Sequence, residues 1–157
     1  MATRTGYVGT TSDGQVLTSA NFTKLPNGGI AYVSATADQT GITAGTNLTN
    51  LSLVITPNAN RLIKISCCAH VGRTVNDGVS VLSIRQNTTN IQNFSYSVST
   101  NNSNRLVTGF TLLSAPAASS TTWRLMLTQV TGTGTSFLSA ASDSIAWLMV
   151  EDIGPSF

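Results

Sequence analysis

From residue 30 to the end of the chain, short apolar segments of strand length alternate with clusters of turn-forming residues. The segments recur about every 10–15 residues, a spacing typical of all-β sandwiches and barrels. No stretch of helical periodicity separates them, which rules out units in which helices connect parallel strands. The sequence therefore predicts an all-β fold for this part of the chain.

Residues 61–71 show the clearest period of two, which is the period of a half-buried strand. One face of this segment would carry Ile63, Ile65, Cys67, Ala69 and Val71, and the other would carry Lys64, Ser66, Cys68 and His70. Two further segments place aromatic and aliphatic residues on a shared face: Phe94, Tyr96 and Val98 in one, Trp123, Leu125 and Leu127 in the other. These sets are the expected core.

Turn chemistry predicts where the strands end. Residues 57–60 form a strong turn cluster, and residues 76–78, Asn-Asp-Gly, predict a turn of the hairpin kind. Residues 40–50 are rich in Thr, Gly and Asn, and we expect them to be irregular. In residues 79–86 the apolar positions change parity midway, which indicates a bulge or a strand with two buried faces.

Ionic residues are scarce in this chain, where only 9% of residues are charged against about 25% in an average globular protein. Polar character comes instead from 24 Thr, 19 Ser and 13 Asn. Helical bundles and coiled coils are excluded, because Glu, Lys and Arg are too few to cover helix surfaces. With 41% hydrophobic residues over 157 positions, the chain can bury a core, and its length fits one domain.

The net charge is +2, and the eight Lys and Arg residues are scattered along the chain. A nucleic-acid surface needs clustered cations, so we expect no direct nucleic-acid partner. The longest apolar run, residues 145–150, is far shorter than the ~20 residues that cross a bilayer. Residues 1–12 lack the apolar region of a signal peptide, so we expect synthesis in the cytoplasm and no membrane partner.

The last apolar segment is informative for assembly. Residues 145–150 are apolar without alternation, which predicts that both faces of this strand are dry. Such a strand lies either at the centre of a thick core or at a subunit interface, and we prefer the interface. The expected interface residues are Ile145, Trp147 and Met149.

Residues that could support catalysis or metal binding do not form a recognisable site. The single histidine, His70, and Cys68 are two positions apart on one strand, about 7 Å, which is too far for a direct hydrogen bond. Cys67 and Cys68 would point to opposite faces and remain reduced thiols. No zinc spacing, paired carboxylates, phosphate loop or nucleotide fingerprint is present. We therefore expect a non-enzyme with no catalytic residues, no cofactor and no metal.

Sugar binding is the function class that this sequence excludes least firmly. Four aromatic side chains could stack on a glycan, namely Tyr32, Tyr96, Trp123 and Trp147. Trp123 shares a face with two leucines and Trp147 lies inside an apolar run, so both tryptophans fit a core or an interface better.

The first 28 residues differ from the rest, because they carry no strand pattern and end in the flexible Asn-Gly-Gly of residues 27–29. We expect an extended N-terminal arm over residues 1–28, with a short helical turn within residues 16–25, and a β domain over residues 29–157. The arm residues expected to make attachment contacts are Arg4, Tyr7, Val16, Leu17, Phe22 and Leu25.

Three stretches carry a resemblance to a family: RTGY with GT, VLTSAN and LPNGG within residues 4–29, ADQTGIT and LTNL within residues 37–51, and VEDIGP at residues 150–155. Together they resemble small virion structural proteins of tailed bacteriophages, including head-decoration, head-fibre and minor tail proteins. The resemblance implies a jelly-roll domain of the tumour-necrosis-factor and C1q type that forms homotrimers. It implies no catalytic residues.

The resemblance leads to two expectations for function. The first is a capsid decoration protein that sits on the virion, attaches through its N-terminal arm, and has itself and the major capsid protein or other virion proteins as partners. The alternative is a minor tail or baseplate protein whose jelly-roll domain binds a host-surface glycan.

Overall fold

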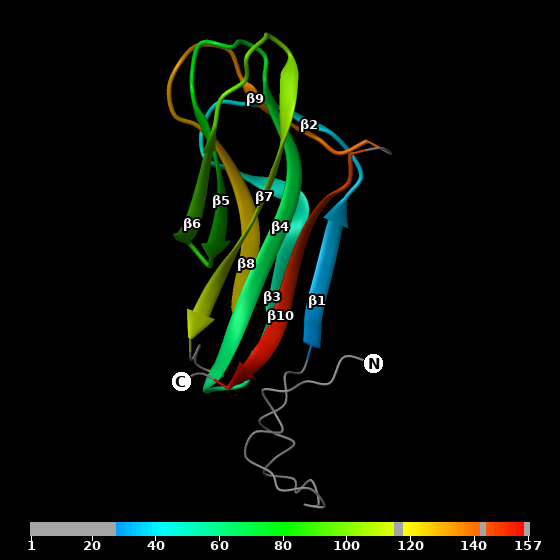
Figure 1. The fold of residues 1–157 in the computed structure, drawn as a ribbon, viewed down its shortest axis with the longest axis vertical. Coiled ribbons are helices and arrows are strands. Elements are labelled where there is room, and N and C mark those ends of the chain that lie inside the picture. The colour runs from blue at the N-terminus through cyan, green and yellow to red at the C-terminus, as the bar shows by residue number, and fades with distance from the viewer. Residues whose placement is uncertain (1–27, 115–117, 142–143, 156–157) are drawn as a thin grey trace, which may run out of the picture.

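The computed structural model describes residues 28–114, 118–141 and 144–155, and the regular elements in these ranges are all strands. They are β1 (Gly28–Ala35), β2 (Gln39–Ile42), β3 (Thr46–Ile55), β4 (Arg61–Arg73), β5 (Ser80–Gln86), β6 (Thr89–Tyr96), β7 (Ser103–Ser114), β8 (Thr121–Gln129), β9 (Ser136–Ser139) and β10 (Ala146–Pro155). The expected all-β fold is confirmed (Figure 1).

The strands form two antiparallel sheets. In the first sheet, β10 lies between β1 and β4, and β7 pairs along the whole opposite edge of β4. The short strands β9 and β2 extend this sheet beside the last residues of β4. The second sheet has the order β3-β8-β5-β6.

Pairing between the strands is nested. β5 and β6 form a hairpin, and outward along the chain β4 pairs with β7, β3 with β8, and β1 with β10. Successive pairs belong alternately to the second and the first sheet. Eight strands rolled up in this way form a jelly roll, as expected.

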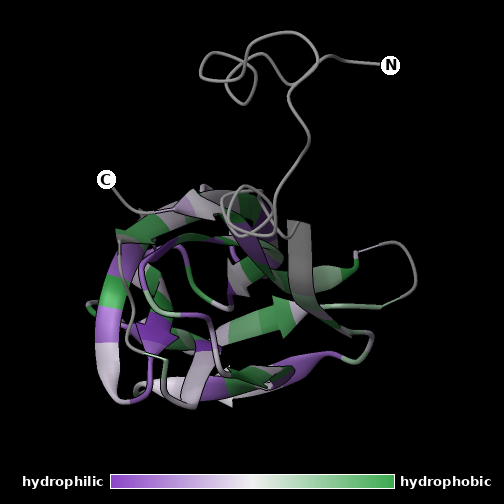
Figure 2. Ribbon diagram, turned by 90° about the horizontal axis from the view of Figure 1, so that it is seen from below, coloured by the Kyte–Doolittle hydropathy of each residue, from purple (hydrophilic) through white to green (hydrophobic). Residues whose placement is uncertain are grey.

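The core lies between the two sheets, which enclose it when viewed along the strands (Figure 2). The alternating residues of β4 predicted to face inward are all buried, and Trp123, Leu125 and Leu127 of β8 are fully buried. Burying a large side chain such as Trp123 stabilises the fold, and its removal from such a site typically costs about 3–5 kcal/mol. The predicted core is therefore confirmed on both sheets.

Asparagine supplies the tight turns and one strand irregularity. The non-glycine residues with positive φ are Asn50, Asn60, Asn87 and Asn102, with φ between 53° and 62°. Asparagine tolerates this left-handed conformation better than most residues, because its short side chain can bond to the nearby backbone. The turn predicted at residues 57–60 is confirmed.

Two local predictions were wrong. Residues 40–50 are not irregular, because β2 and the first half of β3 occupy most of them. The buried side chains of Ile42 and Leu48 anchor this polar stretch, and a register shift near Asn50 hides its alternation. Residues 76–78 do not close a hairpin, because they connect β4 of the first sheet to β5 of the second.

The parity change predicted within residues 79–86 is present. Leu82, Ser83 and Ile84 are consecutive buried residues of β5, and the register with β6 shifts just after Ile84. Burial on two faces is therefore confirmed. The extra residue of the bulge is Ile91 of β6, and the register of β5 with β8 is continuous, so the expected bulge is not in β5.

The domain has two distinct ends. At the base, Arg61 at the start of β4 lies opposite Pro155, and Asp152 lies opposite Gly28 at the start of β1. At the loop end, three connections meet: residues 74–79, 97–102 and 130–135. The 13 residues of β4 span the distance between the two ends, about 40 Å.

Candidate self-association surface

The outward side of the first sheet carries an unusual number of apolar side chains. They come from four adjacent strands, and the register places them in rows: Tyr32 opposite Met149, Met149 opposite Ser66, and Ser66 opposite Phe110. We call this surface the apolar face, and its residues are Tyr32, Trp147, Met149, Lys64, Ser66, Cys68, His70, Glu151, Leu106, Phe110 and Leu112.

Four large hydrophobic side chains on the apolar face are well exposed. Tyr32 is 56% exposed, Leu106 55%, Phe110 57% and Leu112 47%. Met149 and Trp147 of β10 are half-buried and lie next to Tyr32 and Ser34 of β1, and β4 separates them from the β7 side chains. Monomeric soluble proteins rarely leave such a patch uncovered, and large exposed patches mark interaction sites.

An aromatic ring takes part in a side-chain contact on each side of the apolar face. The rings of Tyr32 and Trp147 lie 6.4 Å apart between centroids. On the other side, the Lys64 ammonium lies 5.7 Å from the centroid of the Phe110 ring, within cation–π range. The same ammonium is 3.2 Å from Glu151 Oε2, so the cation and the anion of this face neutralise each other.

Small polar side chains occupy the middle of the apolar face. Ser66 is buried between Met149 and Phe110, and within the described residues its hydroxyl has no hydrogen-bond partner. Cys68 lies between Trp147 and Thr108 in the next row. Partial burial raises the pKa of the Cys68 thiol, so this group is a weak nucleophile at neutral pH.

The two cysteines point to opposite sides of β4, as expected. Cys67 is buried in the core and Cys68 is half-buried on the apolar face, and both are free thiols. Burial, with a smaller effect from Cys68, raises the pKa of Cys67 to about 12. Such a thiol is inert at neutral pH, which fits a packing role.

The structure places the three expected interface residues on one side of the sheet or beside it. Trp147 and Met149 are on the apolar face, and Ile145, which directly precedes β10, is 49% exposed. β10 alternates in burial, with Ala146, Leu148 and Val150 in the core. Its outward side is only half-covered by the chain itself, so the alternative of a central core strand is wrong, and the preferred subunit interface stays a prediction. The expected attachment residues Arg4, Tyr7, Val16, Leu17, Phe22 and Leu25 lie outside the described residues.

Sequence reasoning missed the contribution of β7, which supplies Leu106, Phe110 and Leu112. A signal was present, because residues 105–113 carry apolar side chains at both parities, as residues 145–150 do. The two segments flank β4 on opposite edges. Two non-alternating segments in one chain therefore pointed to a single surface.

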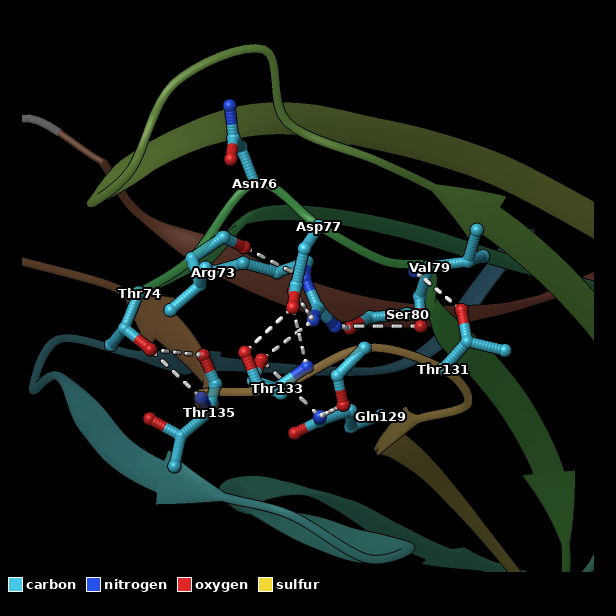
Figure 3. A network of polar contacts seen from close by, with 12 residues as sticks. Arg73, Thr74, Asn76, Asp77, Val79, Ser80, Gln129, Thr131, Thr133 and Thr135 are labelled. Carbon is cyan, nitrogen blue, oxygen red and sulfur yellow. Dashed lines mark hydrogen bonds and ion pairs between the residues drawn. The ribbon is translucent and has the colours of Figure 1, made fainter.

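The loop end is held by a network around one arginine, Arg73, which is fully buried (Figure 3). Its guanidinium donates to the carbonyl oxygens of Val75 at 3.2 Å and Thr133 at 3.0 Å, and to Ser80 Oγ at 2.8 Å. A further contact joins Arg73 to Asp77 Oδ1 at 3.4 Å. One side chain from β4 thus ties together two of the three loops.

Asp77 and the threonines complete the network. Asp77 Oδ2 accepts hydrogen bonds from the Thr133 hydroxyl at 2.6 Å and from the Thr133 backbone N–H at 2.8 Å. These bonds, with a smaller effect from Arg73, lower the pKa of Asp77. Thr74 binds Thr135 through both its hydroxyl and its backbone. These hydrogen bonds join residues 74–79 to residues 130–135 at the loop end.

The remaining chemistry of the described residues is sparse. In ranges 28–114, 118–141 and 144–155, no group of three or more His, Cys, Asp and Glu side chains is placed to hold a metal ion. The same ranges contain no helix that could span a membrane. A groove of about 580 Å³ lies between the edge strands β6 and β7, lined in part by Phe94, Arg105 and Leu106.

No protein-family model and no curated protein matches the chain. Among solved structures, the chain is similar to a chain in a structure of the Gt strain of infectious bursal disease virus, with a TM-score of 0.42 and 12% identity. That match covers 83% of this chain and 38% of the viral chain. A second similarity is to a ruminal GH26 endo-beta-1,4-mannanase, with a TM-score of 0.34 and 13% identity, covering 72% of this chain and 20% of that one.

This chain therefore spans less than half the length of either structural neighbour. The two neighbours are different kinds of protein, and both similarities are too distant to assign a function to this chain.

Proposed function

We propose that this chain is a non-enzymatic structural protein of a virion that forms homotrimers through the apolar face. The observation that carries the proposal is the exposure of Tyr32, Leu106, Phe110 and Leu112 beside the half-buried Trp147 and Met149 on one sheet. The core between the two sheets is complete without these side chains, so their apolar character does not stabilise the single domain. Covering them requires a partner surface.

Charge favours a second copy of the same chain as that partner. Lys64 and Glu151 neutralise each other within the apolar face, at 3.2 Å. Copies can therefore approach through this face without like charges meeting, and an apolar surface with no net charge is compatible with itself. A trimer is the assembly that the sequence resemblance implies.

The virion role is supported by the resemblance and by the composition of the surface. With 9% charged residues, the chain presents hydroxyls and amides, which lose less on desolvation than ions do. Such a surface suits dense packing beside other shell proteins, and its contacts respond weakly to salt. We propose a bacteriophage capsid decoration protein that attaches through residues 1–28 to the major capsid protein or a neighbouring virion protein.

The alternative, a tail or baseplate protein that binds a host glycan, needs exposed aromatic rings. Trp123 is fully buried and Tyr96 is 7% exposed. Trp147 packs beside Tyr32 on the apolar face. Tyr32 is the one of the four aromatic candidates that is well exposed, and it belongs to the surface that we assign to self-association.

The test of self-association is the mass in solution, measured by multi-angle light scattering. Wild-type protein is expected as a trimer, and Phe110→Asp or Trp147→Asp is expected to yield monomers. Val54→Asp is the matched control, because Val54 is 68% exposed on the second sheet and lies outside the apolar face. A wild-type monomer would refute the trimer, and so would dissociation by the Val54 variant alone.

The test of the virion role is binding to purified capsids. Full-length protein is expected to bind at high copy number, and a variant that lacks residues 1–27 is expected to remain a folded trimer that no longer binds. Capsid binding by the shortened protein would contradict attachment through the arm. Adsorption of the purified trimer to host cells, abolished by Tyr32→Ala, would favour the glycan-binding alternative.

A further inference from the structure

Two arginines face each other on the outward side of the second sheet. Arg85 of β5 lies directly opposite Arg124 of β8 in the antiparallel register. The preceding pair in the ladder, Ile84 and Leu125, is fully buried in the core. Successive residues of a strand point to opposite faces, so both arginine side chains leave the sheet on the outward side. Their Cβ atoms are about 4.5–5.5 Å apart in such a pair.

This arrangement concentrates positive charge where the chain supplies no counter-charge. Arginine stays protonated throughout the pH range in which proteins are folded. The three ion pairs formed among the described residues involve Arg61, Lys64 and Arg73, and none includes Arg85 or Arg124. Like charges directly opposite each other destabilise a sheet. Arg85 and Arg124 are therefore two adjacent positive charges without a counter-charge, in a protein with very few charged residues.

The hydrogen-bonding capacity of the two guanidinium groups is also largely unused. Within the described ranges, Nε of Arg85 and Nε of Arg124 are buried and have no acceptor. Arg85 donates to the Thr88 carbonyl and contacts Met126 Sδ at 3.2 Å, whereas Arg124 makes no hydrogen bond with any described residue. A guanidinium carries five N–H donors, so both groups can accept a further ligand.

The neighbours of the pair are small and neutral. Ser52 on β3 lies opposite Arg124 on its other side, and Asn90 on β6 lies opposite Arg85. Both Ser52 and Asn90 are exposed, so the row across the sheet reads hydroxyl, guanidinium, guanidinium, amide. A ligand with several oxygen atoms could bind to all four groups, and no bulky side chain in this row covers the two cations.

We propose that Arg85 and Arg124 together form a binding site for an oxyanion with two negative charges, a phosphate or sulfate group. Two fixed positive charges match one dianion, and the planar fork of arginine suits bidentate binding to such groups. A bound dianion also removes the repulsion between the two guanidinium groups. The site lies on the sheet opposite the apolar face, so it stays accessible whether or not the chain forms trimers.

The test is thermal unfolding in low-salt buffer with sodium phosphate or sodium sulfate, against sodium chloride at equal ionic strength. At about ten times its dissociation constant, phosphate is expected to raise the Tm of wild-type protein by about 3–6 °C more than chloride does. Arg124→Gln and Arg85→Gln are each expected to lose this response. Each variant is also expected to melt slightly above wild type without phosphate, because the repulsion is gone.

Arg105→Gln is the matched control, because it removes the same charge from an exposed position on β7 of the first sheet. It is expected to keep the full response to phosphate. An equal response of all variants would overturn the proposal, and so would an equal loss in Arg105→Gln, since that would reflect net charge alone. Glucose 6-phosphate distinguishes two sources of the ligand. A rise in Tm with glucose 6-phosphate indicates that the site accepts a phosphate ester, whereas a rise with inorganic phosphate alone indicates a free ion. Either result supports the site.

Discussion

Arg61 and Asp152 form a buried ion pair that joins the first residue of β4 to the end of β10. Arg61 Nε lies 3.1 Å from Asp152 Oδ1 and 2.9 Å from Asp152 Oδ2. Arg61 Nη2 lies 2.9 Å from Asp152 Oδ1. Asp152 also accepts the backbone N–H of Gly154 at 3.0 Å, where the register of β10 shifts and Gly154 has a φ of 135°. The pair stabilises the base of the domain, where Gly28 and Pro155 also lie.

Removing one partner of this pair should destabilise the domain strongly. Asp152→Ala is expected to reduce the free energy of unfolding by about 3–5 kcal/mol, because it leaves the Arg61 charge buried without its counter-charge. The double variant Arg61→Met/Asp152→Leu is expected to recover much of that loss. Chemical denaturation measures both, and a loss below about 1 kcal/mol in the single variant would show that solvent reaches the pair.

Gly109 of β7 is needed because the Phe94 ring of β6 lies against it. A Cβ at position 109 would sit 2.2 and 2.3 Å from atoms of that ring. Gly109→Ala is expected to cost about 1–3 kcal/mol, because the ring that closes the edge between the two sheets must move. In Phe94→Leu protein the same glycine substitution should cost much less. Urea denaturation of the four proteins gives the coupling, and additive effects would contradict the contact.

Stability at acid pH should depend on Asp77. Hydrogen bonds from Thr133, together with Arg73, hold its pKa below the ordinary value of 3.8. The stabilisation is therefore present above that value and is lost as the pH falls through the lower pKa of the folded state. The difference in Tm between wild type and Asp77→Asn should be constant near neutral pH and shrink below about pH 4. A difference that persists unchanged to pH 2 would exclude this carboxylate as the cause.

The reactivity of Cys68 should report on the apolar face. In the separate chain this thiol is half-buried beside Trp147, whereas Cys67 is in the core. We expect labelling with a maleimide to be slow for the wild type, in which the proposed trimer covers the thiol. Labelling is expected to be much faster, at one thiol per chain, for Phe110→Asp, which is expected to be monomeric. Cys68→Ala serves as the control and should abolish the fast phase. Equal labelling rates for the wild type and the monomeric variant would mean that the face is not covered.

Strand positions were predictable where alternation was strong. Residues 61–71 and 121–130 gave the correct inward residues, because one face of each strand contacts only the core. Prediction failed at residues 40–50, where burial depends on isolated aliphatic residues such as Leu48 and on a register shift in β3. It failed at residues 76–78 because turn chemistry does not specify which sheet the next strand joins.

The β10 part of the apolar face was predictable from the sequence, and the β7 part was not. Lack of alternation in residues 145–150 pointed to Trp147 and Met149, since a strand apolar on both sides needs two covers. The partners from β7 depend on the pairing of β4 with β7, which is separated by some 30 residues of chain and is fixed only by the fold. The same holds for Arg85 and Arg124, which are far apart in sequence and meet only through the β5–β8 register.

The nested pairing of the strands also determines at which end of the domain an added peptide would lie. Gly28 and Asp152 are opposite each other, so the first and the last strand both have one end at the base of the domain. The connection at residues 97–102 lies at the other end, and Ser99 and Thr100 there are exposed. A peptide grafted at Thr100 would therefore be displayed about 40 Å from Gly28 and Pro155, at the end of the domain where Arg73 joins two of the connections.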